Sequence, residues 1–270
     1  MKPAPFRYAD PGTLDEALAV LSQEGEGAKV LAGGQSLLPL LSMRLAAPTT
    51  LVDINRVPGL DSVEVTGDGV RVGALVRHNA LLHDDAAARV QPLLARATAS
   101  VAHPAIRNRG TTVGSIAHAD PSGEMTSVLA LTDGSVSVAT PDGVETVGWR
   151  DLFVGPLETS IHGPAVVTSA FFPALPPRSG TAFAEVARRK GDYAVCGGGV
   201  VVTLSPDRTV ERVRAAYISV GLTPEVHDLT DAVVGQPADG ADWAGAGRLA
   251  RSLVDPDTDL HASADYRRLL

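Results

Sequence analysis

Two segments rich in glycine and hydroxyl residues are the parts of this chain best suited to chemistry. The first, residues 30–44, reads VLAGGQSLLPLLSMR, where an apolar run ends at Gly33-Gly34, polar Gln35-Ser36 follows, and a second apolar run begins with helical spacing. Paired glycines lack the Cβ atoms that keep a backbone away from a ligand, and free amides in such a turn form a nest for phosphate oxygens. A pyrophosphate is the natural ligand, although glycine pairs also end strands in proteins that bind nothing there.

The second segment, residues 107–124, reads RNRGTTVGSIAHADPSGE and again combines glycines, hydroxyl side chains and a few charges. This composition predicts an irregular loop, and the MTSVLALT that follows predicts a helix. Two such loops in a chain of this size can close on one diphosphate from both sides. An ordinary Asx turn is the plainer interpretation of Asp120-Pro121-Ser122.

No other catalytic machinery is evident in the sequence. It contains no Gly-x-Ser-x-Gly elbow, no His-Glu-x-x-His motif and no Gly-Lys-Ser/Thr phosphate loop. His78 and His83 would not share a helix face, which argues against a metal site there. Cys196 is the single cysteine, so this chain cannot itself supply the four thiolates of a typical iron-sulfur cluster. The pattern favours a bound cofactor that carries the chemistry, oriented by the protein.

Length and charge narrow the class of protein. The 270 residues can bury a core, as one large domain with a satellite or as two modest domains. A formal net charge of -8 and a pI near 5.3 give no reason to expect nucleic acid or an anionic membrane as partner. No apolar run could span a bilayer, and MKPAPFRYADPGT lacks the apolar core of a signal peptide. We expect a globular cytoplasmic protein.

Local signals predict the elements that position the two glycine segments. Thr13 and Glu16 form a capping box before a helix that runs to about Gln23. Alternating residues on both sides of a glycine-rich turn predict a β-hairpin at 63–66 and 70–72. The other predicted elements of this part are helices at 37–45, 78–82 and 86–101, and strands at 29–32, 50–54, 135–139, 144–147 and 166–171.

The proline-rich residues 173–180, PALPPRSG, predict a domain boundary. We expect one domain at 1–174, with subdomains at about 1–57 and 58–174, and a second domain at 180–270. The second domain is predicted to hold a three-stranded antiparallel sheet with helices. Its strands are expected at 182–187, 194–204 and 210–220, and its helices around 225–234, 242–253 and 262–270.

Three motifs in order carry a family resemblance. AGGQSLLPLLSMRLA, RNRGTTVGSIAHADPSGE and RKGDYAV together resemble the FAD-binding medium subunits of molybdenum hydroxylases, most closely those of the carbon monoxide dehydrogenase type. The resemblance covers nearly the whole chain, and the joint occurrence of the motifs is specific. It implies an α+β fold: a two-subdomain FAD-binding domain of the vanillyl-alcohol-oxidase (PCMH) type, followed by a C-terminal flavoprotein domain.

The resemblance also implies which residues contact FAD, with the two glycine segments holding its pyrophosphate. Thr112 and Val113 stand where the family usually has Ile and Gly. Residues that match the family at the pyrophosphate are Ala32, Gly33, Gly34, Gln35, Ser36, Leu37, Gly110, Thr111 and Gly114. Those expected farther along the cofactor are Ser115, Ala117 and His118, then Asp120, Gly123 and Glu124 near the ribityl or ribose hydroxyls.

In the third motif, the residue at the position of Tyr193 covers the isoalloxazine ring in relatives and helps control access to it. The alternative for an aromatic residue at a strand start is plain core packing. Arg188, Arg189 and Asp192 form either a charged cluster near the flavin edge or a solvated surface. The run Cys196-Gly-Gly-Gly199 inside a strand indicates a backbone that approaches the FAD domain or a neighbouring helix closely.

The function implied by the resemblance is that of an FAD-binding electron-transfer subunit. Electrons would come from [2Fe-2S] clusters on a small subunit and leave for an external acceptor, and a large molybdopterin subunit would bind the carbon substrate. The three chains are expected to form a dimer of heterotrimers. Two alternatives stay open: a stand-alone flavin-dependent oxidase or monooxygenase acting on a small metabolite, and a scaffold without tight FAD binding. Val113 motivates both, because a valine does not easily take a positive φ and would bring a branched side chain toward the phosphates. Thr112 and the glycine-rich strand at Cys196 also motivate the stand-alone enzyme.

Overall fold

A three-stranded parallel sheet forms the N-terminal part of the molecule in this computed structural model, which describes residues 2–270. In spatial order its strands are β1 (Arg7–Ala9), β3 (Thr50–Asp53) and β2 (Ala28–Leu31). Its connections are α1 (Leu14–Glu24), the short 3-10 helices η1 (Gly25–Gly27) and η2 (Ile54–Arg56), and α2 (Leu37–Met43). Because β2 and β3 are parallel neighbours, the glycine turn after β2 lies beside η2.

Helix α1 begins and ends as the sequence predicts, with one difference at its start. The Thr13 hydroxyl accepts a hydrogen bond from the Glu16 amide, as in a capping box. The Glu16 carboxylate, however, accepts from the amide of Gly12 at 2.7 Å and not from that of Thr13. The helix buries Ala17, Leu18 and Leu21 against the sheet and stops at Gly25, whose φ is 57°.

Five antiparallel strands form the second sheet, in the order β4-β5-β10-β6-β7. The central strand β10 is the last strand of this sheet in sequence order. It pairs with β5 of the β4–β5 hairpin on one side and with β6 of the β6–β7 hairpin on the other. The bounds are β4 (Val63–Val65), β5 (Gly69–Gly73), β6 (Ser135–Thr140), β7 (Gly143–Gly148) and β10 (Val166–Pro173). The strands predicted here are confirmed. A short helix and ribbon follow β7: α9 (Trp149–Leu152), β8 (Phe153–Gly155) and β9 (Glu158–Thr159).

The helices between β5 and β6 differ from the prediction in two places. They are α3 (His78–Leu82), α4 (Asp85–Val90), α5 (Pro92–Ser100), α6 (Pro104–Arg107), α7 (Thr112–His118) and α8 (Glu124–Leu131). The single helix predicted at 86–101 is wrong, because Pro92 cannot donate to the preceding turn and begins a new helix. The prediction of an irregular loop throughout 107–124 is also wrong, since α7 lies within it.

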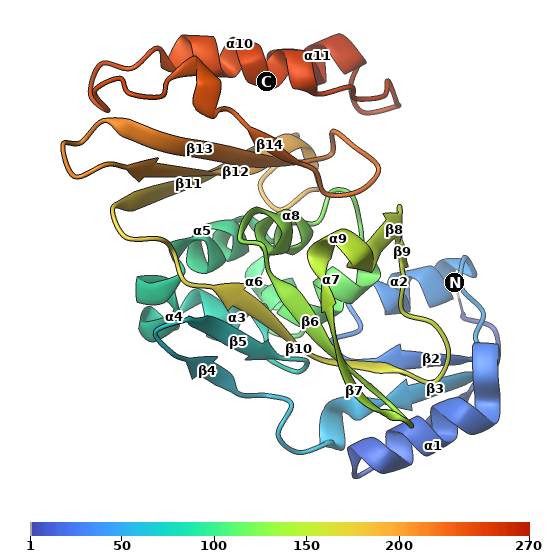
Figure 1. The fold of residues 1–270 in the computed structure, drawn as a ribbon. Coiled ribbons are helices and arrows are strands. Elements are labelled where there is room, and N and C mark those ends of the chain that lie inside the picture. The colour runs from blue at the N-terminus through green and yellow to red at the C-terminus, as the bar shows by residue number, and fades with distance from the viewer. Residues whose placement is uncertain (1) are drawn as a thin grey trace.

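The C-terminal sheet is antiparallel, in the order β11-β12-β13-β14. Its three long strands are as predicted: β11 (Ser179–Ala187), β12 (Ala194–Leu204) and β13 (Val210–Ile218). A fourth strand, β14 (Val226–Asp228), and the 3-10 helix η3 (Thr230–Ala232) replace the helix predicted at 225–234. β14 pairs with the otherwise open edge of β13, a tertiary contact that local periodicity does not reveal. Helices α10 (Trp243–Leu253) and α11 (Ala264–Leu269) are confirmed and cover the outer face (Figure 1).

The inner face of the C-terminal sheet rests on α5 and α8 (Figure 1). A Cβ atom added to Gly199 would lie 3.1 Å from Leu131 and 3.5 Å from Leu93, so the glycine run of β12 does approach these helices closely. Ala216 of β13 belongs to the main hydrophobic core together with the N-terminal elements. Arg214 of the same strand donates to Asp133, just after α8, at 2.6 Å. The two sides of the predicted boundary therefore share packing and an ion pair.

No helix formed by residues 2–270 is long and apolar enough to cross a membrane.

Candidate functional site

The two glycine-rich segments lie in direct contact. A Cβ atom on Gly33 would fall 2.4 Å from the carbonyl oxygen of Arg109 and 2.8 Å from the Cα of Gly110. Real Cβ atoms do not approach this closely, so only glycine allows the first segment to pack on the second. Gly110 is also crowded, because a Cβ there would be 3.1 Å from the ring of His78. The structure thus brings Gly33 beside Gly110 and Thr111.

The first segment presents a run of main-chain donors. Gly34 has a φ of 74°, which turns the chain sharply between β2 and α2. Within residues 2–270, no amide from 33 to 37 donates a hydrogen bond to a protein acceptor. The Gln35 side chain folds back onto the carbonyl oxygen of Gly33 at 3.2 Å. Gly33, Gly34, Gln35, Ser36 and Leu37 therefore offer free N–H groups on a narrow turn, a donor set that fits a pyrophosphate.

The second segment is shaped by a helix cap. Thr111 is buried, and its hydroxyl accepts from the amide of Gly114 at 3.1 Å at the start of α7. Thr111 and Gly114 therefore satisfy each other and fix the helix. Val113 is 2% exposed within the core and belongs to α7, so the expectation that its side chain approaches the phosphates is wrong. His78 is buried beside Thr112, and burial, with the nearby charge of Arg107, lowers the pKa of His78 to about 4.

The residues predicted to lie farther along the cofactor come together at the end of α7. One carboxylate oxygen of Asp120, Oδ1, accepts from the amide of Ser122 at 2.8 Å, which forms the Asx turn of the plainer interpretation. A Cβ on Gly123 would be 3.0 Å from the carbonyl oxygen of Asp120 and 3.7 Å from the Ser115 hydroxyl. Ala117 is exposed on α7. Burial lowers the pKa of His118, an effect that the charge of Asp120 opposes.

Ser219 connects this turn to the start of β12. Its amide donates to the carbonyl oxygen of Pro121 at 2.9 Å, and its hydroxyl lies 2.8 Å from that of Ser122 and 2.7 Å from the carbonyl oxygen of Ala194. Tyr193, which precedes Ala194, is 70% exposed. Partial desolvation and the charges of Asp120 and Glu124 raise the pKa of Tyr193, which places the three side chains in one neighbourhood. Ser219 was missed because no local pattern marks it.

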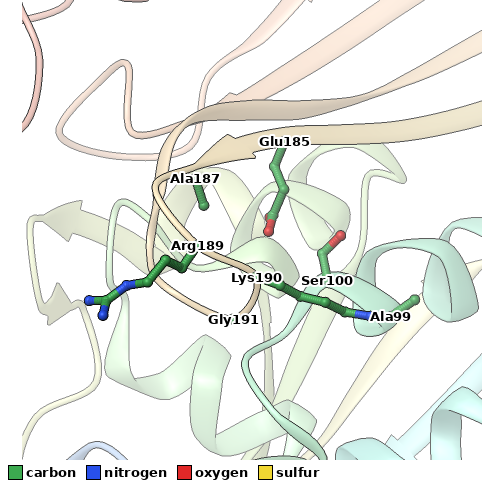
Figure 2. A pocket seen from close by; sticks show the side chains of 7 residues that line it. All are labelled: Ala99, Ser100, Glu185, Ala187, Arg189, Lys190 and Gly191. Carbon is green, nitrogen blue, oxygen red and sulfur yellow. The ribbon is translucent and has the colours of Figure 1, made fainter.

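A pocket of about 290 Å³ lies between the end of α5 and the connection from β11 to β12 (Figure 2). Glu185 points into it from β11, with Ser100 of α5 opposite. One oxygen of the Glu185 carboxylate is buried with no hydrogen-bond partner among the described residues. Gly191 packs on His103, while Arg189 pairs with Asp192 at 3.1 Å near the surface. The lining residues are Ala99, Ser100, Glu185, Ala187, Arg189, Lys190 and Gly191.

Two family models divide the chain between them. An FAD binding domain of molybdopterin dehydrogenases matches residues 4–175, and a CO dehydrogenase flavoprotein C-terminal domain matches residues 181–270. The chain belongs to the FAD-binding medium subunits of molybdenum hydroxylases. Its resemblance to the carbon monoxide dehydrogenase type, its fold and its FAD cofactor are thereby confirmed.

Relatives of this medium subunit match it over nearly their full length. The nicotine 6-hydroxylase medium subunit of Paenarthrobacter nicotinovorans is 39% identical over 272 residues, which are 99% of this chain and 93% of that protein. A carbon monoxide dehydrogenase structure from Hydrogenophaga pseudoflava has a TM-score of 0.92 at 33% identity. Quinoline 2-oxidoreductase from Pseudomonas putida 86 has a TM-score of 0.93 at 35% identity. Each structure match covers 100% of this chain and 94% of the other.

The first residue of α8 in this medium subunit carries a perturbed carboxyl group. Burial, followed by the charges of Glu185 and Asp120, raises the pKa of Glu124 to about 7 from an ordinary value of 4.5. Between these two pH values the folded chain keeps a proton that the unfolded chain loses. The contribution of Glu124 to stability is therefore highest below pH 4.5 and falls as the pH rises toward 7.

We expect the Glu124→Gln variant to be more stable than the parent chain at pH 8, by about 1–3 kcal/mol, because glutamine removes the cost of a buried charge. At pH 4.5 the difference should nearly vanish. Urea unfolding of the FAD-free chain at both pH values measures it, with Glu145→Gln, on the exposed face of β7, as the control. Parallel pH profiles for Glu124→Gln and the parent chain would contradict the expectation.

Within residues 2–270, no group of three or more His, Cys, Asp and Glu side chains is arranged to hold a metal ion.

Proposed function

We propose that this chain is the electron-transfer subunit of a molybdenum hydroxylase complex. Its FAD supplies a relay for electrons from [2Fe-2S] clusters on a small partner subunit to an external acceptor. A large partner subunit with molybdopterin binds the substrate, and the three chains assemble as a dimer of heterotrimers. Membership in the medium-subunit family supports this role, together with the contact between the two glycine segments at Gly33.

The proposed site residues divide into donors and shaping residues. The free amides of residues 33–37 donate to the pyrophosphate oxygens, next to Ala32. Gly110 lets the second segment approach, and Thr111 with Gly114 fixes the start of α7. Farther along the cofactor, the proposed contacts are Ser115, Ala117, His118, Asp120, Gly123 and Glu124.

Side chains at the junction with the C-terminal sheet orient the flavin end and limit access to it. We assign Tyr193 as the cover of the isoalloxazine ring, because it is exposed beside Asp120 and Glu124. We also propose Asp192, which precedes Tyr193 and pairs with Arg189, as a contact at the flavin edge. A carboxyl group with a pKa near 7, such as that of Glu124, can both donate and accept a hydrogen bond at neutral pH. It can therefore serve a cofactor hydroxyl in either role.

The structure gives another explanation for the features that suggested a stand-alone oxidase or a scaffold. Val113 is a buried helix residue with no strained backbone. The glycine run of β12 packs on Leu131 and Leu93, so it needs no separate substrate to explain it. We therefore propose neither.

A spectrum and a copurification test the proposed function. The purified chain should bind FAD and turn yellow, with a visible spectrum that saturates during titration. Expressed with its neighbouring genes or pulled from its own cells, it should copurify with iron and molybdenum. A chain that stays colourless with FAD would refute the flavoprotein assignment, and a yellow chain that never carries iron or molybdenum would refute the complex.

A further inference from the structure

We propose that Asn55 and Arg77 form a brace that sets the separation of the two glycine segments and so positions the FAD pyrophosphate site. This inference rests on the proposed function, because the site that the brace holds is the one assigned there. Neither residue belongs to a glycine segment, and none of the three motifs includes either of them. Both act through backbone carbonyl groups of the segments.

Asn55 holds the first segment. Its side-chain amide donates to the carbonyl oxygen of Ala32 at 2.8 Å, immediately before the glycine pair. Asn55 reaches Ala32 because it lies in η2 after β3, the parallel neighbour of β2. Asp53 fixes the position of Asn55. Its carboxylate accepts from the backbone N–H of Asn55 at 2.9 Å and from the side-chain nitrogen of Asn55 at 2.5 Å.

Arg77 holds the second segment and closes the link. One terminal nitrogen of its guanidinium donates to the carbonyl oxygen of Arg109 at 2.6 Å, and the other donates to the side-chain oxygen of Asn55 at 2.6 Å. The next residue, His78, donates its amide to the carbonyl oxygen of Gly110 at 3.0 Å. A continuous chain of hydrogen bonds therefore runs from Ala32 through Asn55 and Arg77 to Arg109.

The Arg109 carbonyl oxygen is the atom that a Cβ on Gly33 would strike, so the brace acts at the point of closest approach. Within residues 2–270, no hydrogen bond joins residues 32–37 directly to residues 107–111. The brace is thus the hydrogen-bonded connection between the segments. Because both terminal nitrogens of Arg77 donate to protein atoms at the segments and at Asn55, we assign Arg77 as a positioning residue.

The far end of the brace is anchored in the N-terminal sheet. The Tyr8 hydroxyl of β1 donates to the second carboxylate oxygen of Asp53 at 2.5 Å. This bond raises the pKa of Tyr8 to about 12, so the phenol keeps its proton across the pH range of a binding assay. Partial burial, with the neighbouring charge of Arg109, lowers the pKa of Arg77. An arginine guanidinium keeps its charge in proteins.

The test measures FAD affinity of the full chain for Arg77→Met, Asn55→Leu and the double variant. Each single variant should raise the dissociation constant about 10- to 100-fold, as expected for losing hydrogen bonds to a charged group. Because either change breaks the same link, the double variant should be little worse than the worse single one. Arg77→Lys, which can replace only one of the two bonds, should recover part of the affinity. Arg71→Met is the matched control, since Arg71 bonds Ser137 and Ser169 on the second sheet.

A second readout separates positioning from general damage to the fold. At saturating FAD, the visible circular dichroism of the bound flavin should match that of the parent chain, because the brace lies at the pyrophosphate end of the site. FAD affinity within twofold of the parent for Arg77→Met, or fully additive effects in the double variant, would overturn the brace. If Arg77→Met does not fold, Asn55→Asp, which keeps the acceptor for Arg77 but loses the donor to Ala32, decides by the same criterion. A parent chain that binds no FAD would overturn the proposed function itself.

Discussion

Replacing Gly33 with alanine is expected to lower the affinity for FAD at least about 100-fold, close to complete loss at concentrations that saturate the parent chain. The added Cβ would stand 2.4 Å from the carbonyl oxygen of Arg109 and 2.8 Å from the Cα of Gly110. Both are backbone atoms, so no side chain can rotate away, and the two segments must separate. A 100-fold loss corresponds to about 2.7 kcal/mol of binding free energy, well within the cost of such overpacking.

Titration with FAD, followed by the visible spectrum, measures the effect of Gly33→Ala. Gly67→Ala is the matched control, because a Cβ at Gly67 meets nothing within 4 Å and Gly67 has no positive φ. Its affinity should equal that of the parent. An unchanged affinity for Gly33→Ala would mean that the contact between the glycine segments does not shape the cofactor site.

The second large effect concerns stability. Arg267→Met is expected to lower the free energy of unfolding by about 2–4 kcal/mol, since it leaves two carbonyl oxygens without their donors. Arg267 is only 7% exposed, although it lies in the C-terminal helix α11. Its guanidinium donates to the carbonyl oxygens of Val195 at 3.1 Å and Asp257 at 2.6 Å, and to the exposed carboxylate of Asp259. Methionine keeps most of the volume, so the loss reports the hydrogen bonds.

Urea unfolding followed by far-ultraviolet circular dichroism measures the stability of Arg267→Met. Arg268→Met is the control on the same helix, because Arg268 pairs only with the exposed Asp255 and Asp265 and should change stability by less than about 0.5 kcal/mol. Equal stabilities for the two variants would show that the buried guanidinium does not hold α11 on β12. Val195 is two residues from Tyr193, so weaker flavin binding by Arg267→Met is expected as well.

The elements that the sequence predicts correctly are those whose signals are local. Thr13 caps α1, the Gly67–Gly69 turn joins β4 to β5, and alternation marks the long strands of the C-terminal sheet. The errors come from competing or distant interactions. Pro92 divides a helix whose apolar periodicity continues across it, and β14 depends on the open edge of β13.

In the candidate site, too, the sequence predicts the residues marked by local motifs and not those that depend on distant contacts. The motifs point to the two glycine segments, and the structure places the segments in contact. Asn55 and Arg77 could not be found in this way, because their importance depends on β2 and β3 being parallel neighbours. Asn55 left one usable signal, since a polar residue after a buried strand often lies at a binding edge. The prediction for Val113 is wrong because the glycine- and hydroxyl-rich composition indicates a loop, whereas residues 112–118 form the helix α7 that buries Val113.

The contact of Gly199 and Ala216 with the N-terminal core limits which medium subunits can exchange their C-terminal domains by recombination. A genetic crossover between residues 175 and 181 would join the two family domains from different parents at their natural seam. The hybrid would inherit β12 from one parent and the helices beneath it from the other. Any parent with a side chain in place of Gly199 would press it against Leu131 and Leu93. A crossover at this boundary is therefore expected to give a well-packed hybrid only when the side chains of β12 from one parent fit the volume left by α5 and α8 of the other.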